Sequence, residues 1–147
     1  MAKKFLFSLQ PVLAHREYLK QQAQVALAQC MADVAKHEKQ RELLQQEQRE
    51  QELARPNQGG GEMFMVSIVY IEGIKKALEA NQIAINEAKI RVEKARAMLV
   101  ERNRETRALE ILREKQKSEF SYAQKARETK ELDDFGAKQF MRVQGGE

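Results

Sequence analysis

Apolar side chains recur every seven residues through the middle of this chain. The first row steps by seven and consists of Phe64, Ile71, Leu78, Ile85, Val92 and Leu99, followed by Thr106. A second row lies three residues further on and consists of Ser67, Ile74, Asn81, Ala88, Ala95, Arg102 and Leu109. Alternating steps of three and four place both rows on one narrow seam of an α-helix, which is typical of a coiled coil.

A similar but more polar seam precedes it in the sequence. Its members are Leu13, Ala23, Leu27, Cys30, Val34, His37 and Leu44. Residues 45–52 contain no apolar side chain. We therefore expect the helices to separate or fray towards that end, where little apolar surface is available for burial.

The two seams are separated by residues 55–61, in which Pro56 is followed by three consecutive glycines. Proline does not continue a helix, and glycine is costly to order. The sequence therefore predicts an all-α protein in which two long helices form an antiparallel coiled-coil hairpin. We expect helix one at about 9–54, the turn at 55–61, a longer helix two at about 62–141 and a frayed tail at 142–147, all within one elongated domain, 1–147.

Folding about this turn places residue 9 opposite roughly residue 108. About thirty residues of helix two then lack a partner within the chain. These residues either remain free or pair with a second copy, so the pattern leaves the oligomeric state open.

Two features of helix two have alternatives. Residues 63–71 are rich in β-branched and aromatic side chains and are compatible with a strand. Gly73 is a potential break, which would leave 62–72 as a short separate helix. We favour one helix, because a lone strand would have no pairing partner and because the heptad register passes through Gly73 unchanged.

Composition agrees with an elongated helical protein. Of 147 residues, 33% are charged and 6% aromatic, and there is no Trp. The single thiol, Cys30, excludes an internal disulfide and fits a reducing compartment, so a cytoplasmic location is expected. No run approaches the roughly 20 apolar residues that cross a bilayer, so we expect no direct membrane insertion.

The net charge of +4 is distributed unevenly, since residues 91–127 contain eleven Lys and Arg against six Glu. We favour a solvated helix face with ion pairs one turn apart. The alternative is a nucleic-acid-binding coiled coil. Only Phe120 and Tyr122 interleave the basic run as stacking residues, and we therefore expect no nucleic acid among the partners.

Groups able to perform chemistry are sparse. His15 and His37 are far apart and lack ligands at metal-binding spacing, while Cys30 lies on the first seam. Residues 59–61 lack the Lys-Ser/Thr of a phosphate loop. We expect no catalytic residue, no metal site and no cofactor, and hence no enzyme.

Aromatic side chains occur near both ends, in residues 5–7 and 135–141, outside any expected intramolecular pair. Exposed apolar rows of this kind often mark partner sites. The alternative is that the ends pack on each other or in a homodimer.

Three segments of the chain carry distinctive patterns. Residues 5–13 read FLFSLQPVL, residues 108–112 read ALEIL and residues 130–137 read KELDDFGA. Together they resemble the FliJ family of flagellar export proteins, which opens with aromatic-x-aromatic-x-Leu-Gln-x-x-Leu, contains Ala-Leu-Glu-Lys-Leu and closes with Lys-Glu-Leu-Asp-Glu-aliphatic/aromatic-x-Ala. Asp134 stands where Glu is usual, and Gly136 replaces a helix former.

The resemblance implies a non-enzymatic cytoplasmic adaptor of the flagellar type III export apparatus, peripherally associated with the inner membrane. Its implied partners are the export ATPase hexamer, whose assembly it promotes, the cytoplasmic domain of the export-gate protein FlhA, and export chaperones, which it recycles. By the same resemblance, ATPase contacts fall on Phe5, Phe7, Leu9, Leu132, Phe135, Phe140 and Arg142. Export-gate contacts fall on Leu43, Tyr70, Ile74, Ala77 and Asn81. Ile74 also belongs to the seam, so the alternative is that part of this row is core.

A homologous coiled coil of a virulence type III secretion system is the alternative that shares these physical features. Coiled-coil periodicity does not separate the two systems.

Overall fold

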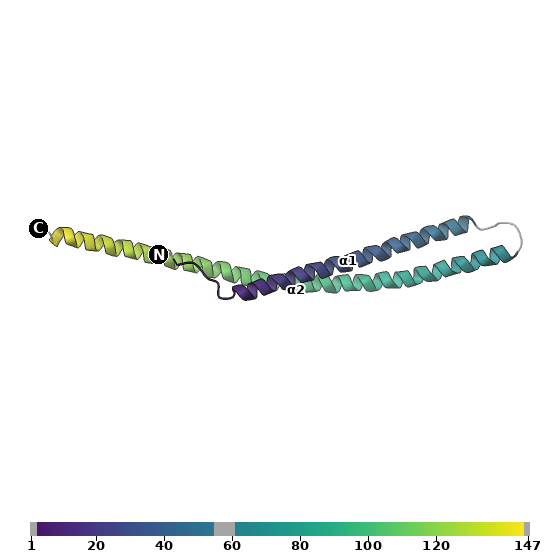
Figure 1. Ribbon diagram of the computed structural model, residues 1–147, viewed down its shortest axis with the longest axis horizontal. Helices are drawn as coiled ribbons and strands as arrows, with labels where there is room; N and C mark the ends of the chain where they lie inside the picture. The colour runs from purple at the N-terminus through teal and green to yellow at the C-terminus, as the bar shows by residue number, and fades with distance from the viewer. Residues whose placement is uncertain (1–2, 55–60, 146–147) are drawn as a thin grey trace. The chain divides into compact units, whose positions relative to one another are not determined.

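The computed structural model describes residues 3–54 and 61–145 of the chain. These residues form two α-helices, α1 (Gln10–Leu53) and α2 (Gly61–Gly145), which pack against each other (Figure 1). This confirms the all-α fold and the greater length of the second helix. The expected turn at 55–61 lies, except for Gly61, outside the described residues.

The first helix begins directly after Leu9, whose carbonyl accepts the first helical hydrogen bond from the Leu13 amide at 2.9 Å. Pro11 lies in the first turn, where its missing N–H is not needed. At the other end, the Ala54 amide donates to the Glu50 carbonyl at 2.9 Å. The polar stretch 45–52 stays helical, because Gln, Glu and Arg are good helix formers even without an apolar face.

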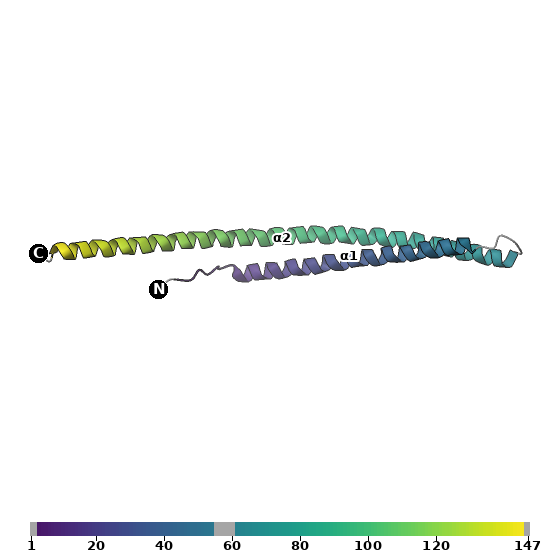
Figure 2. The same ribbon diagram turned by 90° about the horizontal axis from the view of Figure 1, so that it is seen from above.

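The second helix is continuous from Gly61 to Gly145 (Figure 2). The strand alternative for residues 63–71 is therefore wrong, and Gly73 does not break the helix. A single interior glycine costs about 1 kcal/mol relative to alanine. Burial of the seam residues on both sides of Gly73 offsets a penalty of that size.

The predicted frayed tail is also wrong for residues 142–145, which are helical. Arg142 lies in the last turn of α2, where a positive charge interacts favourably with the helix dipole. Residues 146–147 lie outside the described part of the chain.

The chain divides into two compact units. Unit 2 comprises 19–102, and unit 1 comprises 1–18 together with 103–147.

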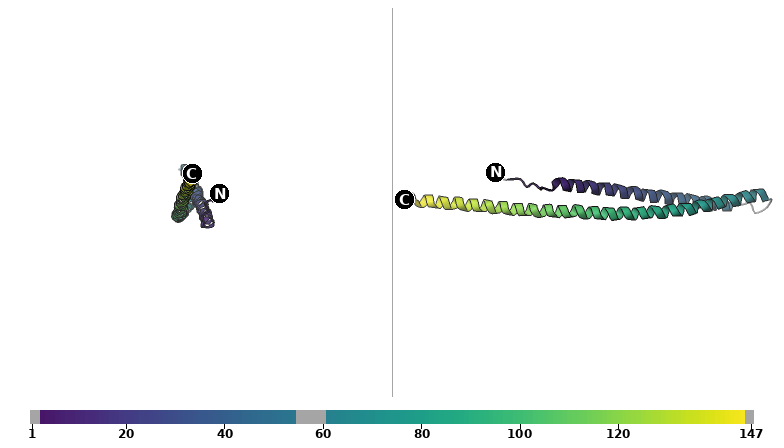
Figure 3. Two further views of the ribbon diagram at one scale, coloured as in Figure 1. Left: turned by 90° about the vertical axis from the view of Figure 1, so that its left-hand side faces the viewer. Right: turned by 90° about the horizontal axis from the view of Figure 1, so that it is seen from below.

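In unit 2, α1 and α2 run antiparallel and side by side (Figures 1 and 3). Partner numbers in α2 fall as numbers in α1 rise, from Asp33 with Arg91 to Arg41 with Gln82 and Glu47 with Tyr70. The buried residues of the unit follow the predicted seam, and they are Ala23, Ile71, Ile74, Asn81, Ile85, Ala88 and Val92. The heptad rows therefore form the contact between the helices.

The α1 side of this contact becomes polar towards the tip of the hairpin. Its half-buried positions continue in steps of three and four and are Leu27, Cys30, Val34, His37, Arg41, Leu44, Gln48 and Gln51. Beyond Leu44 both half-buried seam positions are glutamines. Apolar burial therefore weakens in this direction, as the sequence pattern predicts.

Unit 1 has a small core of its own. Phe7, Leu13 and Thr106 are buried. The rings of Phe5 and Phe120 lie 5.7 Å apart, centroid to centroid, at 52°. The expectation that the aromatics of 5–7 lie outside any intramolecular contact is therefore wrong for both Phe5 and Phe7.

Contacts along α2 in unit 1 differ from the predicted register. Arg16 pairs with Glu105 at 2.7 Å, about one turn further along α2 than residue 9 opposite 108 implies. Continued by seven from Thr106, the first heptad row would reach Arg113, but Arg113 is exposed. The half-buried face instead follows Leu109, Leu112, Gln116 and Phe120. It drifts because a helix of 3.6 residues per turn does not hold a seven-residue repeat without supercoiling.

The one-turn offset and the contact of Phe5 with Phe120 shorten the predicted overhang. The half-buried face extends as far as Gln124, and every described residue from 125 to 145 is exposed.

Candidate functional site

The exposed part of α2 carries an apolar stripe, which we call the C-terminal stripe and define as Leu132, Phe135, Phe140 and Val143. These positions are separated by three, eight and eleven residues from the first, so they share one face of the helix. The side chains of Leu132, Phe135 and Phe140 are 70%, 61% and 64% exposed, and Val143 is also exposed. Several large apolar groups on one helix face favour a protein partner.

The N-terminal part of the predicted ATPase-binding set lies elsewhere in unit 1. Phe7 is buried, Phe5 is half-buried against Phe120, and Leu9 is exposed. Phe120 precedes Leu132 by twelve residues, which is about 18 Å along a helix. The set therefore falls into a packed group around Phe5 and an exposed group that includes the stripe residues and Arg142.

The predicted export-gate set also divides. Ile74 and Asn81 are buried in the seam, whereas Leu43, Tyr70 and Ala77 are exposed. Along this row Ile74 lies in the seam, whereas Tyr70 and Ala77 lie on the exposed face next to it. A single exposed row of four residues is therefore not present, and three residues of the set remain accessible.

Tyr70 joins the two helices of unit 2 at this point. Its hydroxyl donates a hydrogen bond to the Glu47 carboxylate. That hydrogen bond and the negative charge of Glu47 raise the pKa of Tyr70 above its ordinary value. A donated hydrogen bond stabilises the neutral phenol over the phenolate.

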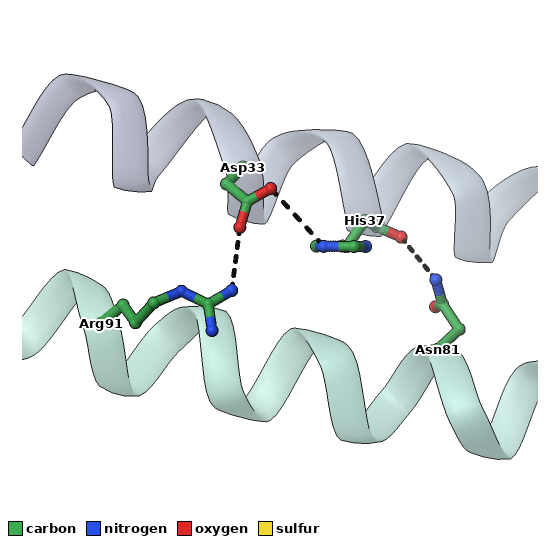
Figure 4. A network of polar contacts seen from close by, with 4 residues as sticks. All are labelled: Asp33, His37, Asn81 and Arg91. Atoms are coloured by element: carbon green, nitrogen blue, oxygen red, sulfur yellow. Dashed lines mark hydrogen bonds and ion pairs between the residues drawn. The ribbon is translucent and has the colours of Figure 1, made fainter.

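A polar network joins the two helices of unit 2 and consists of Asp33, His37, Asn81 and Arg91 (Figure 4). The Arg91 Nη2 atom lies 2.9 Å from Asp33 Oδ2, and His37 Nε2 lies 3.6 Å from Asp33 Oδ1. Asn81 Nδ2 donates to the His37 carbonyl oxygen at 3.2 Å. The hydrogen bond from Arg91 lowers the pKa of the Asp33 carboxyl, and the charges of His37 and Arg91 act in the same direction.

Asn81 is the buried member of this network. Its Oδ1 atom is buried and has no hydrogen-bond partner. An unsatisfied buried acceptor costs about 1–3 kcal/mol. A single buried Asn in a coiled-coil seam fixes the register at such a cost, because other alignments would leave it with still fewer partners.

Replacing Asn81 with Leu should therefore raise the free energy of unfolding by about 1 kcal/mol, since the unsatisfied acceptor is removed. Urea unfolding followed by circular dichroism measures this change. Asn86→Leu is the matched control, because Asn86 is exposed, and we expect a change within about 0.5 kcal/mol. A less stable Asn81→Leu protein would show that the amide contributes more than its burial costs.

The basic run of residues 91–127 is partly neutralised in the structure. Arg91 pairs with Asp33, Arg96 with Glu93 at 3.4 Å and Arg107 with Glu110 at 3.3 Å. Two of these pairs connect residues three apart on the exposed surface of α2. The pattern favours the solvated-face interpretation of this run over a continuous phosphate-binding surface.

The described residues provide little that resembles a reaction centre. They contain no group of three or more His, Cys, Asp or Glu able to hold a metal ion. Cys30 is half-buried on the α1 side of the seam, which agrees with a packing role. Over the same residues, neither helix is apolar enough along its length to span a membrane.

Sequence reasoning missed two features of these surfaces. Val143 belongs to the C-terminal stripe but was not in the predicted ATPase-binding set. Its position eleven residues after Leu132, on the same helix face, was the signal that could have found it. Met63 and Val66 line a groove beside Tyr70 near the hairpin tip. Their row runs beside the seam and becomes recognisable as exposed only when the position of α1 is known.

These observations define a class of protein, a coiled-coil helical hairpin whose accessible features are surfaces for partners. The chain matches the family model described as "Flagellar FliJ protein" over residues 5–145. It therefore belongs to the FliJ family, which confirms the resemblance seen at residues 5–13, 108–112 and 130–137. No curated protein and no solved structure matches the chain.

Membership of this family makes the protein a component of the flagellar export apparatus. The family is non-catalytic, in agreement with the expectation from the sequence. Because the match is to the flagellar family, the flagellar system is favoured over the virulence system.

Proposed function

We propose that this protein is an adaptor of the flagellar export apparatus that binds the export ATPase through the end of α2 and promotes assembly of its hexamer. The C-terminal stripe is the single observation that carries the proposal. It displays Leu132, Phe135 and Phe140 on one helix face, each more than half exposed. Apolar anchors that become fully desolvated supply most of the affinity in protein interfaces.

The neighbouring charges suit such a contact. Arg142 lies in the last turn of α2 beside the stripe, and residues 128–134 contain four acids and one lysine. Charged side chains at the rim of an interface orient the partners and accelerate association. Phe5 and Phe7 act in this proposal by packing within unit 1, while Leu9 remains available for direct contact.

The adaptor also contacts the cytoplasmic domain of the export gate and recycles export chaperones. For the gate contact we retain Leu43, Tyr70 and Ala77 as surface residues. Ile74 and Asn81 support that surface from within the seam. The protein acts in the cytoplasm at the membrane-bound apparatus. A mass measurement in solution would give its oligomeric state.

Removal of residues 130–147 should abolish the effect of this protein on ATP turnover by the export ATPase, because the whole C-terminal stripe is lost. The measurement compares turnover with the full chain, with the shortened chain and with no added protein. The helical content per residue of the shortened chain serves as the control for folding. Undiminished stimulation by the shortened chain would exclude contact through the end of α2.

A further inference from the structure

A groove lies between the last turn of α1 and the first turns of α2 in unit 2. Its volume is about 670 Å³, and it is lined by Gln51, Ala54, Glu62, Met63, Val66, Ser67 and Tyr70. Met63, Val66 and Tyr70 are three and four residues apart, so they form one wall along α2. We call this feature the tip groove.

Exposed apolar side chains form most of the wall of the tip groove. The side chains of Met63 and Val66 are 78% and 68% exposed, and no charged residue occurs between Glu62 and Glu72. Met65 and Val69 extend the surface through an adjoining hollow that they share with Val66 and Tyr70. Clustered apolar groups of this kind mark interaction sites, and methionine side chains adapt readily to a partner's shape.

The edge of the tip groove is negatively charged. The last turn of α1 contains no basic residue, and residues 47–54 contain three acids, Glu47, Glu50 and Glu52, against one base, Arg49. The carbonyl groups at a helix C-terminus add a partial negative charge. Arg55 follows in the sequence and lies outside the described residues.

Hydrogen bonds hold several of these carboxylates. Gln46 Nε2 donates to Glu50 at 3.3 Å, and Tyr70 donates to Glu47 at the edge of the groove. Glu62 lines the groove itself. An apolar wall with fixed acids at its edge therefore complements an apolar segment with basic flanks.

We propose that the tip groove binds an amphipathic helix of a partner protein whose apolar face is flanked by Lys or Arg. The helix lies along the wall formed by Met63, Val66 and Tyr70, as in helix-in-groove recognition. Its basic side chains neutralise Glu62 and the end of α1. A second copy of this chain is disfavoured as the occupant, because a symmetric contact between two tip grooves would place the same acids opposite each other.

The proposal does not rest on the ATPase or gate contacts. Tyr70 is the one residue that the tip groove shares with the predicted export-gate set. The test therefore changes Val66 and Glu62, which belong to neither predicted binding set, and uses only the purified full-length chain and synthetic peptides.

The probe is a fluorescently labelled amphipathic helical peptide with leucines on one face and lysines at its flanks. A matched peptide carries glutamates in place of the lysines. We expect the lysine peptide to bind at least about tenfold more tightly, although its charge has the same sign as the net charge of +4 on the chain. Fluorescence anisotropy at physiological salt measures both affinities.

Val66→Asp should weaken binding of the lysine peptide by at least about tenfold, because it places a carboxylate on the apolar wall. Val25→Asp is the matched control and should leave binding unchanged, since Val25 is similarly exposed on α1. Glu62→Lys should weaken binding several-fold, whereas Glu79→Lys, at an exposed position outside the groove lining, should not. Circular dichroism verifies that each variant keeps its helical content.

Equal binding of the two peptides would overturn the charge complementarity on which the proposal depends. Unchanged binding by both Val66→Asp and Glu62→Lys would place the peptide outside the tip groove. A dimer in sedimentation that Val66→Asp dissociates would identify a second copy as the occupant and would likewise overturn the proposal.

Discussion

Replacing Leu132 with Asp should weaken binding to the export ATPase by at least about tenfold, or ~1.4 kcal/mol, while the helical circular-dichroism signal stays unchanged. The side chain of Leu132 is 70% exposed, so its replacement removes little packing from the protein alone. In the proposed complex the same position is desolvated, and a buried carboxylate without a partner is costly. Titration of the labelled protein with purified ATPase measures the change.

Ile111→Asp is the matched control for this result. Ile111 is also exposed and lies on α2 in unit 1, but it does not belong to the C-terminal stripe. We expect its replacement to leave ATPase binding within about twofold of the original value. If Leu132→Asp instead reduces the helical signal, Leu132 contributes to stability, and the assignment of the stripe to ATPase binding fails.

Replacing Ile85 with Ala should lower the free energy of unfolding by about 2–5 kcal/mol. Ile85 lies in the seam of unit 2 and is 0% exposed, so the truncation leaves a cavity that the two helices close only in part. Domains of this size are stable by only about 5–15 kcal/mol, and the loss is therefore a large share. Urea unfolding followed by circular dichroism gives the value.

Ile83→Ala provides a control of identical chemistry. Ile83 is two residues away on the same helix and is 60% exposed. Its replacement should change stability by less than about 0.5 kcal/mol, because little apolar area is lost and alanine is the better helix former. Similar losses for both variants would contradict the assignment of Ile85 to the seam.

Most of the fold in unit 2 was predictable from spacing alone. The rows through Ile71 and Ile74 identified the face of α2 that is buried, because burial against a parallel or antiparallel neighbour imposes a heptad repeat. Continuity through Gly73 followed from the same register. The end of α2 was less predictable. Gly136 and the short polar tail suggested fraying, whereas the helix continues to Gly145 with Arg142 in its last turn.

The packing of unit 1 was not available from periodicity. Phe5 belongs to a non-helical segment, so no repeat indicates that it meets Phe120. The drift from Arg113 to Leu112 and Gln116 depends on the local supercoil, which the sequence pattern does not determine residue by residue.

The candidate surfaces were predictable to different degrees. Leu132, Phe135 and Phe140 are exposed as the sequence suggested, and their role in ATPase binding remains a prediction. The export-gate set mixed two neighbouring faces, because a row such as Tyr70, Ile74 and Ala77 has the same spacing as the seam beside it. Only the position of the partner helix decides which of these faces is covered.

The polar α1 side of the seam has a consequence for local unfolding. Between Leu44 and Leu53 the α1 side of the seam contributes little apolar burial, so opening the helix pair here costs less free energy than opening it around Ile85. The tip groove lies at this same end. A partner that needs more room than the groove offers can thus separate α1 from α2 there, while the layers around Ile85 and Val92 remain closed.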